Sequence, residues 1–141
     1  MRSQAVVCNV VLSDLPGTYT NCVDYQGGGY GPYTVNITGT STGPTSAALV
    51  IKNLAAGAFG PFGPSDNALN PGIKVNIDWS NPANFTAVVT TQPFYVDPTY
   101  GQAKMVTDVG TFSSCANTFT LNYSVAVAAG SFGAFTTTIA R

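Results

Sequence analysis

Apolar and polar residues alternate one by one along most of this chain. The longest run of this kind is 118–127, where large apolar residues alternate with threonine, asparagine and serine, and the same period recurs over 33–38 and 73–79. A period of two is typical of a β-strand that buries one face and exposes the other. We therefore expect antiparallel sheet rather than helix, with at most one helical turn over 53–58.

Glycine and proline separate these runs at intervals of about ten residues, which is typical of β-barrels and sandwiches. The predicted fold is an all-β antiparallel meander barrel or sandwich, formed by a single β domain over 1–141. Residues 1–12 are expected to contain a separable N-terminal strand, and Gly133 is a candidate β-bulge. The segment 57–72, the longest irregular piece, is where we expect features specific to this protein. The eight to ten expected strands lie near 5–12, 17–25, 32–38, 47–54, 73–79, 84–91, 93–96, 103–109, 117–128 and 132–140.

Charged residues make up only 8% of the 141 residues, and the chain contains no histidine. All six acidic residues are aspartates. These counts exclude a Ser-His-Asp or Cys-His catalytic relay and a histidine metal site. A net charge of −1 with five scattered basic residues argues against nucleic-acid binding. No run of about 20 apolar residues is present to predict a transmembrane segment.

Threonine, serine and asparagine occupy the polar strand positions that lysine and glutamate usually fill. A neutral polar surface with a sequence pI of about 4.8 is more typical of secreted and cell-surface proteins than of cytosolic ones. We therefore expect an extracellular or cell-envelope location, with any leader removed, since Met1 and Arg2 precede no secretory apolar segment.

The three cysteines allow three single disulfides, each leaving one thiol. For an exported chain we expect one bridge, with Cys22–Cys115 the first candidate, because it would join an early strand to the last third of the chain. Three buried thiols are the alternative. Cys8 could instead carry a lipid, although Val7 before it is a poor match to the small residue that lipoprotein processing requires.

Three motifs resemble small exported lipoproteins of Bacteroidetes-type bacteria: LPGTYTNC at 15–22, PYTVNITG at 32–39 and LVIKNLAAGAFG at 49–60. The tail, with VGTF at 109–112, Cys115 and 118–141, follows the same pattern loosely. The GTY start is also similar to the first strand of lipocalin-like (calycin-like) barrels. The resemblance implies a meander barrel in or near the cell envelope and transfers no catalytic residue.

The aspartates are the remaining candidates for acid-base chemistry, because a glycosidase needs two carboxylates at a set separation. Asp78 and Asp97 are the pair we consider, while Asp14, Asp24 and Asp66 are interpreted as turn residues. No cofactor is expected. Asp66 and Asn67 form a weak candidate calcium site, since oxygen ligands are what calcium binds.

Tyrosines and glycines are concentrated in the segment 24–33, DYQGGGYGPY. Flat rings with hydroxyl tips suit sugar stacking or protein contact, and the alternative is a hairpin whose tyrosines cap the core. A second aromatic platform is predicted further along the chain. The candidate ligand-binding residues are Tyr25, Tyr30, Tyr33, Trp79, Tyr95 and Tyr100.

These observations favour a non-enzymatic, exported or cell-surface β-domain that acts as a binding or envelope module. Its expected partners are a carbohydrate or another envelope protein. The alternative is a structural subunit that self-associates by β-strand addition through its N-terminal strand. An aspartate-based carbohydrate-active enzyme ranks third.

Overall fold

Ten antiparallel strands form the fold in the computed structural model, which describes residues 8–62, 68, 69 and 71–141. The 3-10 turn η1 (Leu12–Asp14) precedes the first strand, and the short helix α1 (Ala56–Phe59) and 3-10 turn η2 (Gly60–Phe62) follow the third. The all-β prediction is confirmed, and the expected helical turn is α1. The strands are β1 (Gly17–Tyr25), β2 (Gly29–Gly43), β3 (Ser46–Lys52), β4 (Ile73–Asp78), β5 (Thr86–Val89), β6 (Gln92–Asp97), β7 (Gly101–Val106), β8 (Asp108–Ser113), β9 (Thr118–Val127) and β10 (Gly130–Ala140).

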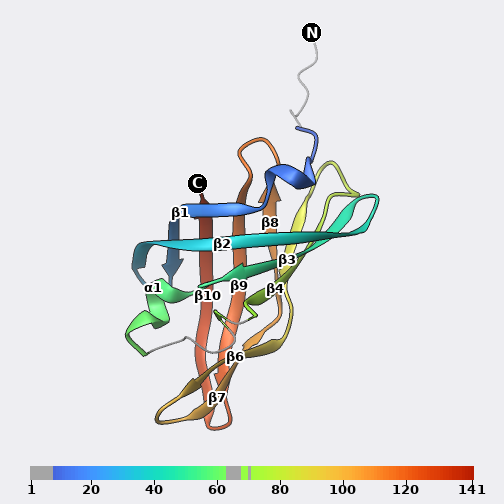
Figure 1. Ribbon diagram of the computed structural model, residues 1–141. Coiled ribbons are helices and arrows are strands. Elements are labelled where there is room, and N and C mark those ends of the chain that lie inside the picture. The colour runs from blue at the N-terminus through green and yellow to red at the C-terminus, as the bar shows by residue number, and fades with distance from the viewer. Residues whose placement is uncertain (1–7, 63–67, 70) are drawn as a thin grey trace.

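Eight of these strands close into a barrel, in the order β1-β2-β3-β4-β5-β8-β9-β10, because β10 pairs with both β9 and β1 (Figure 1). Closure decides between the two predicted architectures in favour of a meander barrel. The remaining hairpin, β6–β7, is inserted between β5 and β8. Strand β8 pairs with β9 over 118–120, and β7 continues along the same strand over 124–126.

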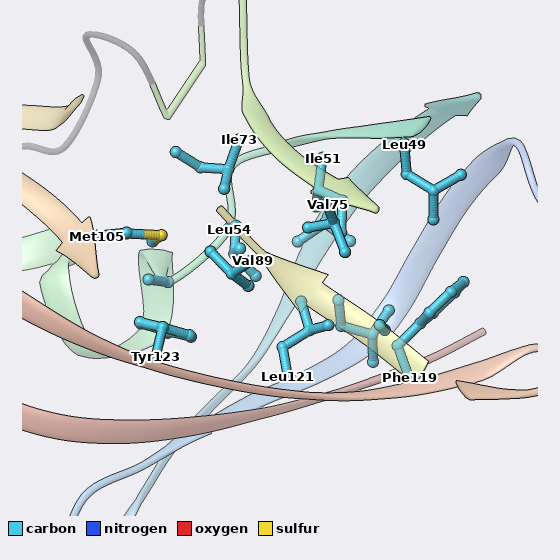
Figure 2. Packing of buried hydrophobic residues seen from close by; sticks show 14 of the residues in the cluster. Leu49, Ile51, Leu54, Ile73, Val75, Val89, Met105, Phe119, Leu121 and Tyr123 are labelled. Atoms are coloured by element: carbon cyan, nitrogen blue, oxygen red, sulfur yellow. The ribbon is translucent and has the colours of Figure 1, made fainter. Parts of the chain in front are cut away.

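The barrel interior is filled by the apolar face of each alternating run (Figure 2). Leu121, Leu49, Val75 and Val89 have no exposed surface. Burying an aliphatic or aromatic side chain stabilises the fold by about 1.5–3 kcal/mol. The alternation of apolar and polar residues along each strand therefore specifies which face of the strand turns inward. The inward face thus forms a packed core and not an open channel.

One end of the barrel is covered by the residues before β1 and by the last residue of the chain. The Arg141 guanidinium lies 4.7 Å from the centroid of the Tyr19 ring and donates to the carbonyls of Asp14, Leu15 and Pro16. Tyr19 in turn donates a 2.5 Å hydrogen bond to the Leu15 carbonyl. The end of β1 that follows Val23 lies at the opposite end of the barrel, beside α1.

Two predicted strands are corrected by the structure. Over 8–12, the described part of the predicted strand 5–12, the chain is not a strand and η1 begins at Leu12. The predicted strand 103–109 is two strands, β7 and β8, that separate at Thr107, whose N–H donates to Thr91 Oγ1. No glycine or proline marks this break, so the alternation alone did not show it.

The predicted Cys22–Cys115 bridge is wrong: the disulfide joins Cys8 to Cys115. Cys22 is a buried free thiol facing the core, because irregular pairing with β2 breaks the alternation of β1 between Tyr19 and Cys22. The bridge ties the segment before η1 to the β8–β9 turn. It also occupies the sulfur of Cys8, so this residue carries no lipid in the bridged protein. No helix among the described residues has the length and apolar character that would let it cross a membrane.

Candidate functional site

A pocket of about 640 Å³ lies at the α1 end of the barrel. Four segments from distant parts of the sequence form it: the β1–β2 turn, the α1–η2 segment, the β6–β7 turn and the start of β10. Part of the irregular segment 57–72 thus contributes to the site. The lining residues are Gln26, Tyr30, Gly57, Ala58, Phe59, Pro61, Tyr95, Asp97, Pro98, Thr99, Tyr100, Phe132 and Phe135.

Six of the thirteen lining residues are aromatic. Phe59 of α1 is the centre of the group, with its ring centroid 5.0 Å from that of Phe135, 5.8 Å from Tyr95 and 6.1 Å from Phe132. Phe132 also meets Tyr100 edge to face at 5.7 Å. Such contacts add about 0.5–1.5 kcal/mol each beyond the area they bury, so the rings hold one another in place.

Helix α1 is held in position by Asp24, a fully buried carboxylate of β1. Asp24 Oδ1 accepts hydrogen bonds from the hydroxyls of Tyr33 at 2.5 Å and Thr137 at 2.7 Å. Its Oδ2 accepts the backbone N–H of Ala58 at 2.9 Å. Asp24 was expected to be a turn residue, but it faces inward. The irregular pairing of β1 with β2 after Tyr19 changes which residues of the strand point into the barrel.

Burial raises the pKa of Asp24 above its usual range, and the hydrogen bonds to its carboxylate from Tyr33, Thr137 and the backbone of Ala58 and Gly57 offset part of that shift. The same burial, together with the charge of Asp24, raises the pKa of Tyr33. Tyr33 therefore stays protonated, donating to Asp24 and accepting the Ala55 N–H at 3.0 Å. This arrangement is structural: it joins β1, β2, β10 and α1.

A close backbone contact also fixes α1 against β2. A Cβ atom placed on Gly57 would lie 2.2 Å from the carbonyl oxygen of Tyr30, a distance that no side chain tolerates. Glycine at 57 therefore lets the helix approach the strand. A Cβ at Gly60, one turn later, would meet nothing within 4 Å.

Among the described residues of the pocket lining, Asp97 supplies the one carboxylate. It ends β6, and its Oδ1 accepts the N–H groups of Thr99 at 2.8 Å and Tyr100 at 3.0 Å, which fixes the β6–β7 turn. Its Oδ2 accepts the Tyr95 hydroxyl at 2.8 Å. The hydrogen bond from Tyr95, followed by those from the backbone, lowers the pKa of Asp97, so the group is ionised at neutral pH.

The pocket brings together three of the six predicted ligand-binding residues, Tyr30, Tyr95 and Tyr100. Tyr25 is as exposed as Tyr30, at 45% against 46%, but it does not line the pocket. Tyr33 lies beneath α1 with its hydroxyl committed to Asp24.

Trp79 lies at the far end of the barrel. Its backbone N–H donates to the carbonyl of Thr45 in the β2–β3 turn, whereas α1 follows the opposite end of β3. Asp78 beside it pairs with Ser46 and accepts hydrogen bonds from Ser80. The structure therefore does not bring Asp78 and Asp97 together as a catalytic pair.

The candidate calcium residues Asp66 and Asn67 lie outside the described residues. Within the described ranges, no cluster of three or more aspartate or cysteine residues is arranged to hold a metal ion.

Sequence reasoning missed the phenylalanines of the pocket, Phe59, Phe132 and Phe135. A signal for two of them was present, because Phe132 and Phe135 fall out of phase around Gly133. The predicted bulge is confirmed: the pairing of β10 with β9 shifts between Ser131 and Gly133. No comparable signal in the sequence distinguished Phe59, because its position in the pocket depends on how α1 packs against β1 and β2.

No family model, curated protein or solved structure matches this chain. The closed barrel is consistent with a lipocalin-like architecture. It does not by itself identify a family.

Proposed function

We propose that this protein is a non-enzymatic binding module that takes a small organic ligand into the pocket at the α1 end of its barrel. The observation that carries the proposal is the pocket itself, with its volume of about 640 Å³ and the six aromatic side chains in its wall. Ligand sites commonly measure about 300–1,000 Å³, are mainly apolar with a few placed polar groups, and often lie in the mouths of β-barrels.

The chemistry of the pocket favours binding over catalysis. Asp97 is the single acid among the lining residues that the structure describes, and no thiol or amine accompanies it there. Both of its oxygens already accept hydrogen bonds from the protein, which suits a fixed charge better than a proton-transfer group.

An extracellular or envelope-surface location belongs to the same proposal. The Cys8–Cys115 disulfide supports it, because such bonds form and persist in oxidising compartments. A barrel at the cell surface would meet its ligand from the medium.

Assembly by strand addition is the alternative proposal, and it needs an unpaired strand edge. The ring of eight strands closes on itself, and of the described strands β6 is the one that pairs on a single side. No further observation favours assembly, so ligand binding is the function that we propose.

The neutral fluorescent probe N-phenyl-1-naphthylamine tests pocket binding. We expect saturable one-to-one binding that weakens about fivefold in Tyr30→Ala and in Tyr100→Ala, since each removes part of the aromatic wall. Tyr25→Ala is the matched control, because this ring has the same exposure in the same hairpin but lies outside the pocket. Absence of saturable binding, or an equal loss in Tyr25→Ala, would overturn the proposal.

A further inference from the structure

The pocket contains a negative charge with no positive partner among its described lining residues. Asp97 is only 7% exposed, and the described lining includes neither lysine nor arginine. A buried carboxylate in an otherwise neutral cavity attracts a positive group and repels a negative one, and the effect is stronger inside the cavity than in water.

The aromatic wall acts in the same direction. The face of an aromatic ring carries partial negative charge and attracts cations that come within about 6 Å of its centre. Tyr100, Phe132 and Phe59 stand next to one another along the wall, with centroid distances of 5.7 and 6.1 Å between successive rings. A cation in the pocket would therefore meet both aromatic rings and a carboxylate.

Two polar residues of the lining already use their hydrogen-bonding groups within the protein. Asp97 uses both oxygens within the protein, and the Gln26 amide N–H is donated to the Phe132 carbonyl at 2.7 Å. A sugar is recognised chiefly through directional hydrogen bonds to its hydroxyls. A bulky ammonium group needs chiefly charge and apolar contact, which Asp97 and the aromatic rings offer, while the hydroxyls of Tyr30, Thr99 and Tyr100 can meet polar parts of the ligand.

We propose that the pocket binds an organic cation, an alkyl- or arylammonium group whose charge lies beside Asp97 and whose apolar part packs against Tyr100, Phe132 and Phe59. This inference rests on the proposed function and gives the chemical class of its ligand. The carboxylate acts through its charge, held in a fixed place by Tyr95 and the β6–β7 turn.

The test uses two probes of the same shape that differ in charge: (3-hydroxyphenyl)trimethylammonium and 3-tert-butylphenol. Each is titrated against the full chain in competition with N-phenyl-1-naphthylamine. We expect the wild-type protein to bind the cation about tenfold more tightly than its neutral counterpart. In Asp97→Asn we expect the two affinities to become similar, with the neutral probe unaffected.

Asp78→Asn is the matched control, because it removes the same charge from a similar turn at the other end of the barrel. It should keep the tenfold preference. Emission of Trp79, which lies outside the pocket, checks that each variant is folded.

The outcomes separate the two proposals. Equal affinity of the wild-type protein for both probes, or a preference that survives Asp97→Asn, would overturn the cation inference and leave the binding pocket in place. Failure of N-phenyl-1-naphthylamine itself to bind the wild-type protein would overturn the proposed function as well.

Discussion

Tyr33 donates a 2.5 Å hydrogen bond to Asp24 inside the barrel. The bond joins a phenol of β2 to a carboxylate of β1 beneath α1. Thr137 donates to the same oxygen and is itself hydrogen-bonded at 2.7 Å to the buried hydroxyl of Tyr123. The barrel thus contains a polar chain within its apolar core, and the chain ends at the helix that forms the pocket wall.

Asp24 should make the protein less stable as pH rises. Its pKa is higher in the folded protein than in the unfolded chain, where it is about 3.9, so the folded state binds the proton more tightly. The stabilising contribution is complete below about pH 4 and is lost as pH rises through the folded pKa. In Asp24→Asn, urea unfolding followed by Trp79 emission should show a flatter dependence on pH.

Asp78→Asn is the control for this measurement. Hydrogen bonds from Ser80 lower the pKa of that exposed carboxyl, so its pKa shift is opposite in sign to that of Asp24. It should leave the loss of stability above pH 4 unchanged. An Asp24→Asn profile parallel to that of the wild type would contradict the prediction.

Gly57→Ala should displace α1. The new Cβ would collide with the Tyr30 carbonyl, and relieving such overlap costs about 1–3 kcal/mol. Both the free energy of unfolding and the affinity for N-phenyl-1-naphthylamine should fall. Gly60→Ala is the matched change in the same segment and should alter neither by much, because its Cβ meets nothing within 4 Å and its backbone is helical. Equal effects of the two substitutions would refute this account.

Cys22 should be unreactive in the folded protein. The thiol is buried, and burial raises its pKa to about 11, so little thiolate forms at neutral pH. Titration with 5,5′-dithiobis(2-nitrobenzoic acid) should detect no thiol in the native protein and one in denaturant. After reduction in denaturant it should detect all three cysteines of the chain. Rapid labelling of the native protein would show that the thiol is accessible.

Loss of the Cys8–Cys115 bridge should lower the free energy of unfolding by about 3–5 kcal/mol. The bridge spans 107 residues, and closing a loop of that length restricts the unfolded chain strongly. The double variant Cys8→Ser, Cys115→Ser tests this in urea. Ser114→Ala removes only the hydrogen bond to the Cys8 carbonyl and should cost about 1 kcal/mol. A double variant no less stable than Ser114→Ala would disprove the prediction.

The strands were predictable from the sequence wherever one face is buried along the whole run. Strand β9 alternates without interruption, so its limits follow from the residues alone. Strand β1 does not, because its irregular pairing between Tyr19 and Cys22 changes which residues face inward. This irregularity hid the burial of Asp24 and the free state of Cys22.

The pocket was predictable only in part, for a related reason. Alternation reports which face of a strand is buried but not which loops meet at the end of a barrel. Tyr30 and Tyr100 stood out by residue type, whereas their proximity depends on the β6–β7 insertion and on α1. Val10 and Val11 resemble strand residues, yet the adjacent Cys8 is held at the β8–β9 turn by its disulfide.

One edge of β9 is shared by β8, a strand of the barrel, and by the inserted hairpin β6–β7. This arrangement separates part of the pocket wall from the closed ring of strands. Hairpin β6–β7, which carries Asp97 and Tyr100, is joined to β9 through three residue pairs, whereas β10 is paired along nearly all of β9. Substitutions in the β6–β7 turn therefore alter the shape and charge of the pocket without breaking the ring of eight strands. Selection can change the pocket wall through this inserted hairpin while the barrel sequence stays constant.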